Sequence, residues 1–228
     1  AQEAFVMSED AIKEYYSKVG LKEWRRLIRD PYHRLEFDTT MHFLRKYLPP
    51  KGLVLDAGGG PGRYTIELAK LGYDVVLLDL TPKLLQIAKS GAPIFVSVIG
   101  RLAVLINAII YWPHEMENSR IYQHICETGD YHGIQGVYTK WYAGKKAIFP
   151  PAHFYLAEEL EKSFRKRNVK ILEMVGLEGL ATRHQKEINR LFKKYPNAWK
   201  NWQEIHLKTC THPTAVGISE HFMIICKK

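Results

Sequence analysis

The feature that most constrains this chain is a glycine-rich turn between two apolar runs, VLDAGGGPGRYTIELAKLGYDVVLLDL, from Val54 to Leu80. The run LVLDA leads into the glycines, the amphipathic stretch GRYTIELAKL follows and ends near Gly72, and YDVVLLDL is a second apolar run. A strand, a helix and a strand with continuous apolar strands predict a parallel sheet that helices cover on both faces. We therefore expect an α/β, doubly wound fold.

The turn points to a ligand that contains a nucleoside. Bare backbone at the start of a helix offers free N–H groups and lets a ligand approach closely. Asp79 ends the second run, where an acid at the carboxyl edge of such a sheet binds ribose hydroxyls. The lysine of a nucleotide P-loop is absent, and a dinucleotide motif that starts at Gly58 meets Arg63 in place of its third glycine. NAD, a flavin and a turn that only packs remain alternatives.

The pattern Asp56-x-Gly58-x-Gly60-x-Gly62, followed by DLTPKLLQIA from Asp79, resembles the class I S-adenosylmethionine-dependent methyltransferases. Their first motif is an acid with alternating glycines, and their second is an acid that ends the second strand. The segment YYSKVGLKEWRRLIRDPYHRLEF is similar to the N-terminal helical cap of a bacterial and archaeal subgroup without a settled substrate. The resemblance implies a Rossmann-like sheet of order 3-2-1-4-5-7-6 with strand seven antiparallel, and S-adenosyl-L-methionine as cofactor.

The resemblance also implies a set of cofactor-binding residues. The glycines would line the methionine and ribose end, the first acid would orient the cofactor through its amino group, and the second acid would take the ribose hydroxyls. Leu80 would pack on adenine, Tyr15 or Tyr16 would close over the cofactor, and Arg34 would reach its carboxylate. The implied cofactor-binding residues are Asp56, Gly58, Gly60, Gly62, Asp79, Leu80, Tyr16 and Arg34.

Two strands of the family's sheet have no counterpart in this sequence. The helix that starts after Asp79 runs directly into GAPIFVSVIGR, which looks like the family's fifth strand. Either the chain is trimmed, or strands three and four belong to a segment absent between Ser90 and Gly91. We favour the second interpretation, because a sheet without strand four leaves the glycine strand without its central neighbour. It predicts that the two Cα atoms lie much farther apart than the ~3.8 Å of a bonded pair.

We expect a single methyltransferase domain over residues 1–228, with a helical cap at 1–50 and a substrate-lid insertion at 111–155. The insertion is rich in aromatic side chains and lacks clear periodicity. Its candidates to face a substrate are Tyr111, His114, His132, Tyr138, Trp141, His153 and Tyr155. Methyl transfer needs positioning foremost, so the sequence identifies no catalytic residue. Plain packing or a dimer contact is the alternative for the insertion.

Composition limits the partners without naming the acceptor. A net charge of +9 attracts anions, including nucleic acid, although most Lys/Arg groups fall on predicted helix faces. We predict an unidentified small-molecule acceptor; an RNA such as tRNA is the first alternative, and a non-catalytic S-adenosylmethionine- or nucleotide-binding protein is the second. His206, Cys210 and His212 do not have the spacing of a zinc site, so we predict no metal and a surface helix end.

The cysteines and the apolar runs of the sequence indicate in which cellular compartment the protein is expected. Cys126, Cys210 and Cys226 are widely spaced, which fits a reducing compartment, and the N-terminus has no signal pattern, so we predict a cytoplasmic protein. The apolar stretch 92–113 is long enough to span a bilayer, but Arg101 sits near its centre. We expect it to form a buried strand and a helix.

Overall fold

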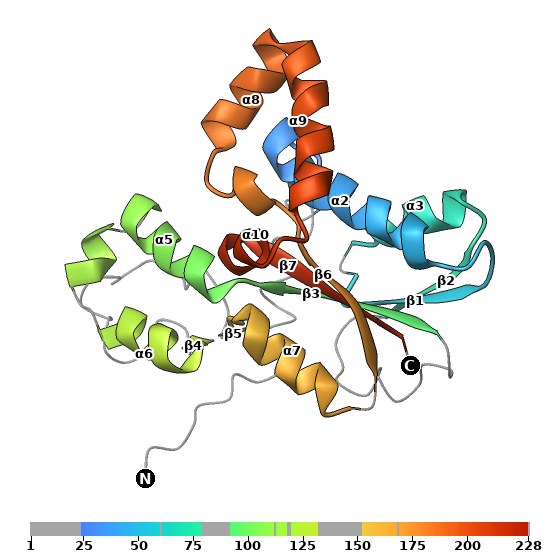
Figure 1. Ribbon diagram of the computed structural model, residues 1–228, viewed down its shortest axis with the longest axis horizontal. Helices are drawn as coiled ribbons and strands as arrows, with labels where there is room; N and C mark the ends of the chain where they lie inside the picture. Colours follow the sequence, from blue (N-terminus) through green and yellow to red (C-terminus); the bar gives the residue numbers. More distant parts are fainter. Residues whose placement is uncertain are drawn as a thin grey trace.

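The computed structural model describes residues 24–59, 61–78, 92–111, 113–117, 120–131, 152–167 and 169–227 (Figure 1). Its α-helices are α2 (Pro31–Tyr47), α3 (Arg63–Lys70), α5 (Arg101–Tyr111), α6 (Arg120–Thr128), α7 (Ala157–Arg165), α8 (Gln185–Lys194), α9 (Pro196–Thr209) and α10 (Pro213–Ile218). Its strands are β1 (Leu53–Ala57), β2 (Asp74–Leu78), β3 (Pro93–Ile99), β4 (Asp130–Tyr131), β5 (Ala152–His153), β6 (Lys170–Gly176) and β7 (His221–Lys227). Two 3-10 turns, η1 (Pro113–Glu117) and η2 (Gly179–Ala181), complete the described elements.

The largest sheet has the order β3-β7-β6, and β7 is antiparallel to both neighbours. Successive side chains of β7 point to opposite faces of the sheet and join two different apolar clusters. Phe222, Ile224 and Cys226 pack towards α7 and α10, whereas Met223 and Ile225 pack towards Phe43 of α2. Helices cover both faces of this sheet, so the central strand β7 is a continuous apolar run (Figure 1).

The second sheet consists of β1 and β2, which pair in parallel from Leu53↔Asp74 to Ala57↔Leu78. Helix α3 makes the crossover between these two strands, so the strand–helix–strand unit predicted around the glycine turn is confirmed. Val54 and Val75 pack with Leu68 of α3 and with Met41 of α2. Leu53 remains 71% exposed.

Helix α2 joins the two sheets (Figure 1). Pro31 is its first residue and the Asp30 side chain caps it by accepting a hydrogen bond from the His33 N–H, in agreement with the break expected at the proline. Met41 contributes to the cluster over β1 and β2, while Phe43 contributes to the cluster over β6 and β7. A single helix of the predicted cap is therefore a common wall for both halves of the core.

Two local expectations need correction, and a third is confirmed. The region 111–155 contains the amphipathic helix α6, whose Tyr122 and Ile125 are buried, although the sequence indicated no regular element there. The sequence AVGISEHFMIICKK was expected to form one final strand, but the strand starts only at His221, because the preceding residues form α10. The stretch 92–113 forms β3 and α5, and within the described ranges no helix is long and apolar enough to cross a membrane.

Part of the predicted sheet order is visible. In the part of the chain that the structure describes, β1 pairs only with β2, and β3 pairs only with β7. The molecule is a mixed α/β protein, and the complete order 3-2-1-4-5-7-6 stays a prediction. The predicted break between Ser90 and Gly91 lies outside the described residues, and the domain boundaries proposed from the sequence also remain predictions.

Candidate functional site

The glycine turn connects β1 to the open N-terminus of α3. Gly58 and Gly62 have φ angles of +75° and +81°, a backbone region that favours glycine. The Gly62 N–H donates to the Gly59 carbonyl at 2.8 Å and closes the turn. No side chain caps α3 at Gly62, so the helix presents backbone N–H groups at this end.

Asp56 lies inside the turn rather than beside it. The Thr65 hydroxyl of α3 donates to its Oδ2 at 2.5 Å. A Cβ atom added to Gly59 would lie 2.5 Å from the same oxygen, so the backbone passes directly over the carboxylate. This geometry agrees with the expectation that Asp56 sits within the turn, whereas its contact with a cofactor stays a prediction.

The other half of the predicted cofactor site lies outside the described residues. This holds for Gly60, Asp79, Leu80, Tyr15 and Tyr16. The pairing of Ala57 with Leu78 brings the ends of β1 and β2 to one edge of the sheet. The described part of β2 therefore ends at the same edge of the sheet as the glycine turn.

Arg34 lies on the exposed side of α2. Its guanidinium pairs with Asp38 one helical turn away, at 3.2 Å between Nε and Oδ2. Together with Glu67 of α3 and Leu207 of α9, it lines an open groove between the three helices. The structure thus gives Arg34 an intrahelical partner, and its predicted contact with a cofactor carboxylate stays a prediction.

Of the candidates in the region 111–155, His153 has the richest polar environment. Its ring nitrogens lie 2.7 Å from Asp130 Oδ1 and 2.7 Å from Glu159 Oε1, and Tyr155 packs edge-on against the ring. Glu159 also accepts a hydrogen bond from the buried Arg101 at 2.6 Å. Tyr111 is exposed and His114 lies in η1, while His132, Tyr138 and Trp141 fall outside the described residues.

The structure also reveals a buried polar group that the sequence analysis missed, the His221 cluster, which consists of Arg26, Glu36, Glu178 and His221. Arg26 makes a two-pronged ion pair with Glu36, and His221 Nδ1 lies 2.8 Å from Glu178 Oε1 and 3.6 Å from Glu36 Oε2. The signal in the sequence was a charged residue, Glu36, within the buried stripe of α2 between Leu35 and Thr39.

The charges of the His221 cluster balance when the imidazole is protonated. The ligand atoms of Glu36, Glu178 and His221 lie within 4.8 Å of one another, which is close enough for a divalent cation. However, Arg26 already holds both oxygens of Glu36, and Glu178 Oε2 accepts hydrogen bonds from the His221 backbone and the Ser219 hydroxyl. Two cations then face two carboxylates, so the cluster needs no further charge.

We expected the segment HLKTCTH, which contains His206, Cys210 and His212, to be a helix end at the surface. The structure shows that this expectation was wrong. His206 is 2% exposed and its Nε2 lies 2.8 Å from the Thr39 hydroxyl of α2, while Cys210 is fully buried. Burial lowers the pKa of His206 to about 4, so this histidine is neutral at physiological pH. His212 instead caps α10 through its side chain. The three residues therefore serve packing and capping.

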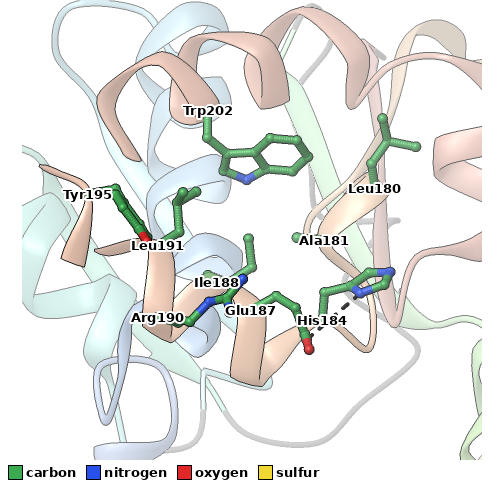
Figure 2. Close-up of a pocket in the computed structure, with 9 residues that line it drawn as sticks. All are labelled: Leu180, Ala181, His184, Glu187, Ile188, Arg190, Leu191, Tyr195 and Trp202. Carbon is green, nitrogen blue, oxygen red and sulfur yellow. Dashed lines mark ion pairs between the residues drawn. The ribbon is translucent and has the colours of Figure 1, made fainter. Parts of the chain in front are cut away.

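A separate pocket lies between η2, α8 and α9 (Figure 2). Ala181 and Ile188 form its buried floor, the Trp202 indole forms one wall, and His184 pairs with Glu187 at its rim. None of the cofactor-binding residues implied by the sequence lines this pocket. Its residues belong to the segment that follows β6, away from the glycine turn in the sequence.

Comparison with known proteins points to the methyltransferases. Magnesium-protoporphyrin O-methyltransferase of Rhodobacter capsulatus is 52% identical to this chain over 94 residues, which cover 36% of this chain and 42% of that protein. The tRNA 5-carboxymethoxyuridine methyltransferase of Escherichia coli K12 is 46% identical over 44 residues, which cover 19% and 17% of the two chains. No family model matches the chain.

These relatives support methyl transfer as the general chemistry, since both are named methyltransferases although their acceptors differ in size. The chain spans less than half the length of the curated relatives it matches.

Proposed function

We propose that this chain is a class I methyltransferase that uses S-adenosyl-L-methionine. The observation that carries this proposal is the glycine turn, in which Asp56 lies under the backbone between a strand and the uncapped end of α3. The similarity to two named methyltransferases supports it independently. Asp56, Gly58 and Gly62 would then hold the methionine and ribose end of the cofactor, and Asp79 would bind the ribose hydroxyls.

The arrangement of the strands supports the fold part of the proposal. The observed pairs β2-β1 and β3-β7-β6, with β7 antiparallel, agree with the two ends of the order 3-2-1-4-5-7-6. In that order, strand four would lie between β1 and β3, the two strands whose facing edges are unpaired among the described residues. We therefore propose that both sheets are parts of one sheet.

For the acceptor, we propose a small molecule of the metalloporphyrin type, methylated at oxygen. This rests on the similarity to a magnesium-protoporphyrin O-methyltransferase, the more extensive of the two similarities described above. The aromatic region 111–155 would then cover the acceptor. The three cysteines, all free, continue to support a reducing compartment such as the cytoplasm.

A tRNA acceptor is the second candidate. Two observations favour it: the similarity to a tRNA methyltransferase and the net charge of +9, which attracts the phosphate backbone of a nucleic acid. A non-catalytic protein that only binds S-adenosylmethionine or a nucleotide is a further alternative.

Cofactor binding can be tested by calorimetry with S-adenosylhomocysteine and with NADH. We expect S-adenosylhomocysteine to bind and NADH not to bind; the reverse result would refute the proposal. Asp79→Ala should weaken S-adenosylhomocysteine binding by about tenfold or more, because a charge-assisted pair of hydrogen bonds is lost. The matched control is Asp74→Ala, at the opposite end of β2, where the side chain is exposed.

The acceptor can be tested by transfer of a labelled methyl group from S-adenosylmethionine. We expect label in magnesium-protoporphyrin and none in tRNA. Label in tRNA, lost as the salt concentration rises, would support the second candidate. Cofactor binding without transfer to either acceptor would favour a non-catalytic role or another acceptor.

A further inference from the structure

The helix that follows the glycine turn is attached to the segment that precedes α2. Arg63, the first residue of α3, donates to the Trp24 carbonyl at 3.0 and 2.7 Å from two of its nitrogens. Its guanidinium also lies over the Trp24 ring, 3.9 Å from the centroid. The next residue, Tyr64, stacks on Phe37 of α2 at 5.5 Å between centroids. The cap and the turn are therefore in direct contact.

The segment before α2 that contains Trp24 is also linked to the large sheet, through Arg26. Arg26 pairs with Glu36 of α2, and Glu36 faces His221 at the start of β7. His221 in turn pairs with Glu178, two residues after the end of β6. The Ser219 hydroxyl donates to Glu178 Oε2 at 3.0 Å and accepts from the Glu178 and Gly179 N–H groups. The His221 cluster thus ties together three segments that are distant in the sequence.

A second link runs parallel to the first. The Tyr32 hydroxyl of α2 donates to Glu220 Oε2 at 3.2 Å and accepts a hydrogen bond from the Arg183 N–H at 3.1 Å. Arg183 also pairs with Glu220 at 3.0 Å and donates to the Ala103 carbonyl. The His221 cluster and the contacts of Tyr32 therefore hold α2 together against the segments next to the ends of β6 and β7.

We propose that the His221 cluster is an ionic bridge by which the large sheet holds the cap, and that the cap in turn positions Arg63 and the N-terminus of α3 at the glycine turn. Glu36, Glu178 and His221 are then positioning residues, which act on the cofactor site through α2 and Trp24 without touching the cofactor. The positioning role rests on the proposed function, since it concerns the S-adenosylmethionine site. The bridge itself does not depend on that function.

The protonation of His221 fits this arrangement. Burial alone would lower the pKa of His221, but Glu36 and Glu178 raise it to about 9, against the weaker opposing effect of Arg26. Burial would likewise raise the pKa of Glu36, and His221 and Arg26 together hold it below the ordinary value. These are the charged groups that face the imidazole from α2, from the segment before it and from the end of β6. The contribution of His221 to the bridge is therefore fully present below its ordinary pKa of 6.5 and is lost as the pH rises through about 9.

The test compares His221→Gln and Glu36→Gln with the wild-type protein. The matched control is Glu161→Gln, which removes a carboxylate from an exposed Glu–Arg pair on α7. Three quantities are measured: S-adenosylhomocysteine affinity by calorimetry, hydrogen exchange of the α2 amides, and the pKa of His221 by NMR. We expect each bridge variant to lose about tenfold in affinity and to exchange faster in α2, while the control changes neither.

Two further results would identify the bridge as one unit. The double variant should lose no more affinity than Glu36→Gln alone, because the two residues share one interaction. Wild-type affinity should fall above pH 9, and Glu36→Gln should move that decline to lower pH. A wild-type His221 pKa near 6.5, together with unchanged α2 exchange in both variants, would overturn the bridge.

The outcomes separate this inference from the proposed function. If wild-type protein does not bind S-adenosylhomocysteine, the proposed function and the positioning role both fail, and the exchange and NMR data still decide whether the bridge exists. If wild-type protein binds and both bridge variants bind equally well, the positioning role is refuted and the proposed function stands. If either variant does not fold, the pH dependence of wild-type affinity and the NMR titration provide the test.

Discussion

The two sheets of this protein contain equally apolar strands and bury them very differently. In β7, Phe222, Ile224 and Cys226 are at most 1% exposed, because helices cover both faces of β3-β7-β6. In β1 and β2, Leu53 is 71% exposed and Val76 is 43% exposed. The strands that carry the glycine turn are therefore the less protected half of the molecule.

This difference shows that an apolar run encodes a strand but not its burial. Parallel strands are normally buried on both faces, and a sheet of two strands is marginal without further neighbours. Among the described residues, β1 and β2 obtain most of their cover from α2 and α3, and Phe95 of β3 also packs against this cluster. The large sheet therefore supplies most of the stability, and the small sheet carries the proposed site.

The largest expected effect compares one residue from each sheet. Phe222→Ala should lower the free energy of unfolding by about 3–5 kcal/mol, because it leaves a cavity beneath α7 and α10. Leu53→Ala, at a mostly exposed position, should change it by less than about 0.5 kcal/mol. Urea denaturation of both variants measures the difference. Equal losses would mean that Leu53 is buried in solution, and the contrast between the sheets would be wrong.

An intermediate effect concerns the pH dependence of stability that His206, which packs near the large sheet, causes. The folded pKa of His206 is about 4, below its ordinary value of 6.5, so the unfolded chain binds the proton more tightly. Its contribution to stability is therefore present above pH 6.5 and is lost as the pH falls towards 4, by about 3 kcal/mol. Denaturation at pH 7, 5.5 and 4 measures this loss.

The variant His206→Gln is the control, and its stability should vary less with pH over this range. His221 responds in the opposite direction, since its raised pKa makes its contribution disappear at alkaline pH. A His206→Gln profile as steep as that of the wild-type protein between pH 7 and 4 would show that another group causes the acid loss.

The smallest expected effect on stability concerns Arg34, beside the small sheet. Arg34→Ala removes an exposed ion pair with Asp38 and should change the free energy of unfolding by no more than about 0.5 kcal/mol. If Arg34 holds the carboxylate of the cofactor, S-adenosylhomocysteine affinity should nevertheless fall severalfold. An unchanged affinity would restrict Arg34 to its pair with Asp38 and remove it from the proposed site.

Local patterns predicted most of the regular elements. The switch from apolar run to glycines to amphipathic helix predicted β1, the turn and α3, and the stretch 92–113 was expected to form the strand and helix that are β3 and α5. Helix α6 was missed because it is short and lies among irregular aromatic residues. The apolar residues before His221 were assigned to the final strand, since an apolar run alone does not distinguish a short helix from a strand.

The sequence predicted the local geometry of the candidate site only where that geometry depends on backbone shape. The positive φ angles of Gly58 and Gly62 require glycine, and the sequence therefore displays that requirement directly. The roles of His206, Glu178 and His221 depend on partners far away in the sequence. His206 was expected at a surface helix end, and it is buried because Thr39 of α2 and Gly179 of η2 lie against it.

The sequence by itself determined the strand–turn–helix unit, because glycine conformations and the spacing of apolar residues are local properties. Only the tertiary structure decided which charges meet. Arg26, Glu36, Glu178 and His221 come from three segments that lie far apart in the sequence and meet only in the folded chain. Burial makes such charges costly unless they are paired, so the packing of α2 against β6 and β7 brings them together as one cluster.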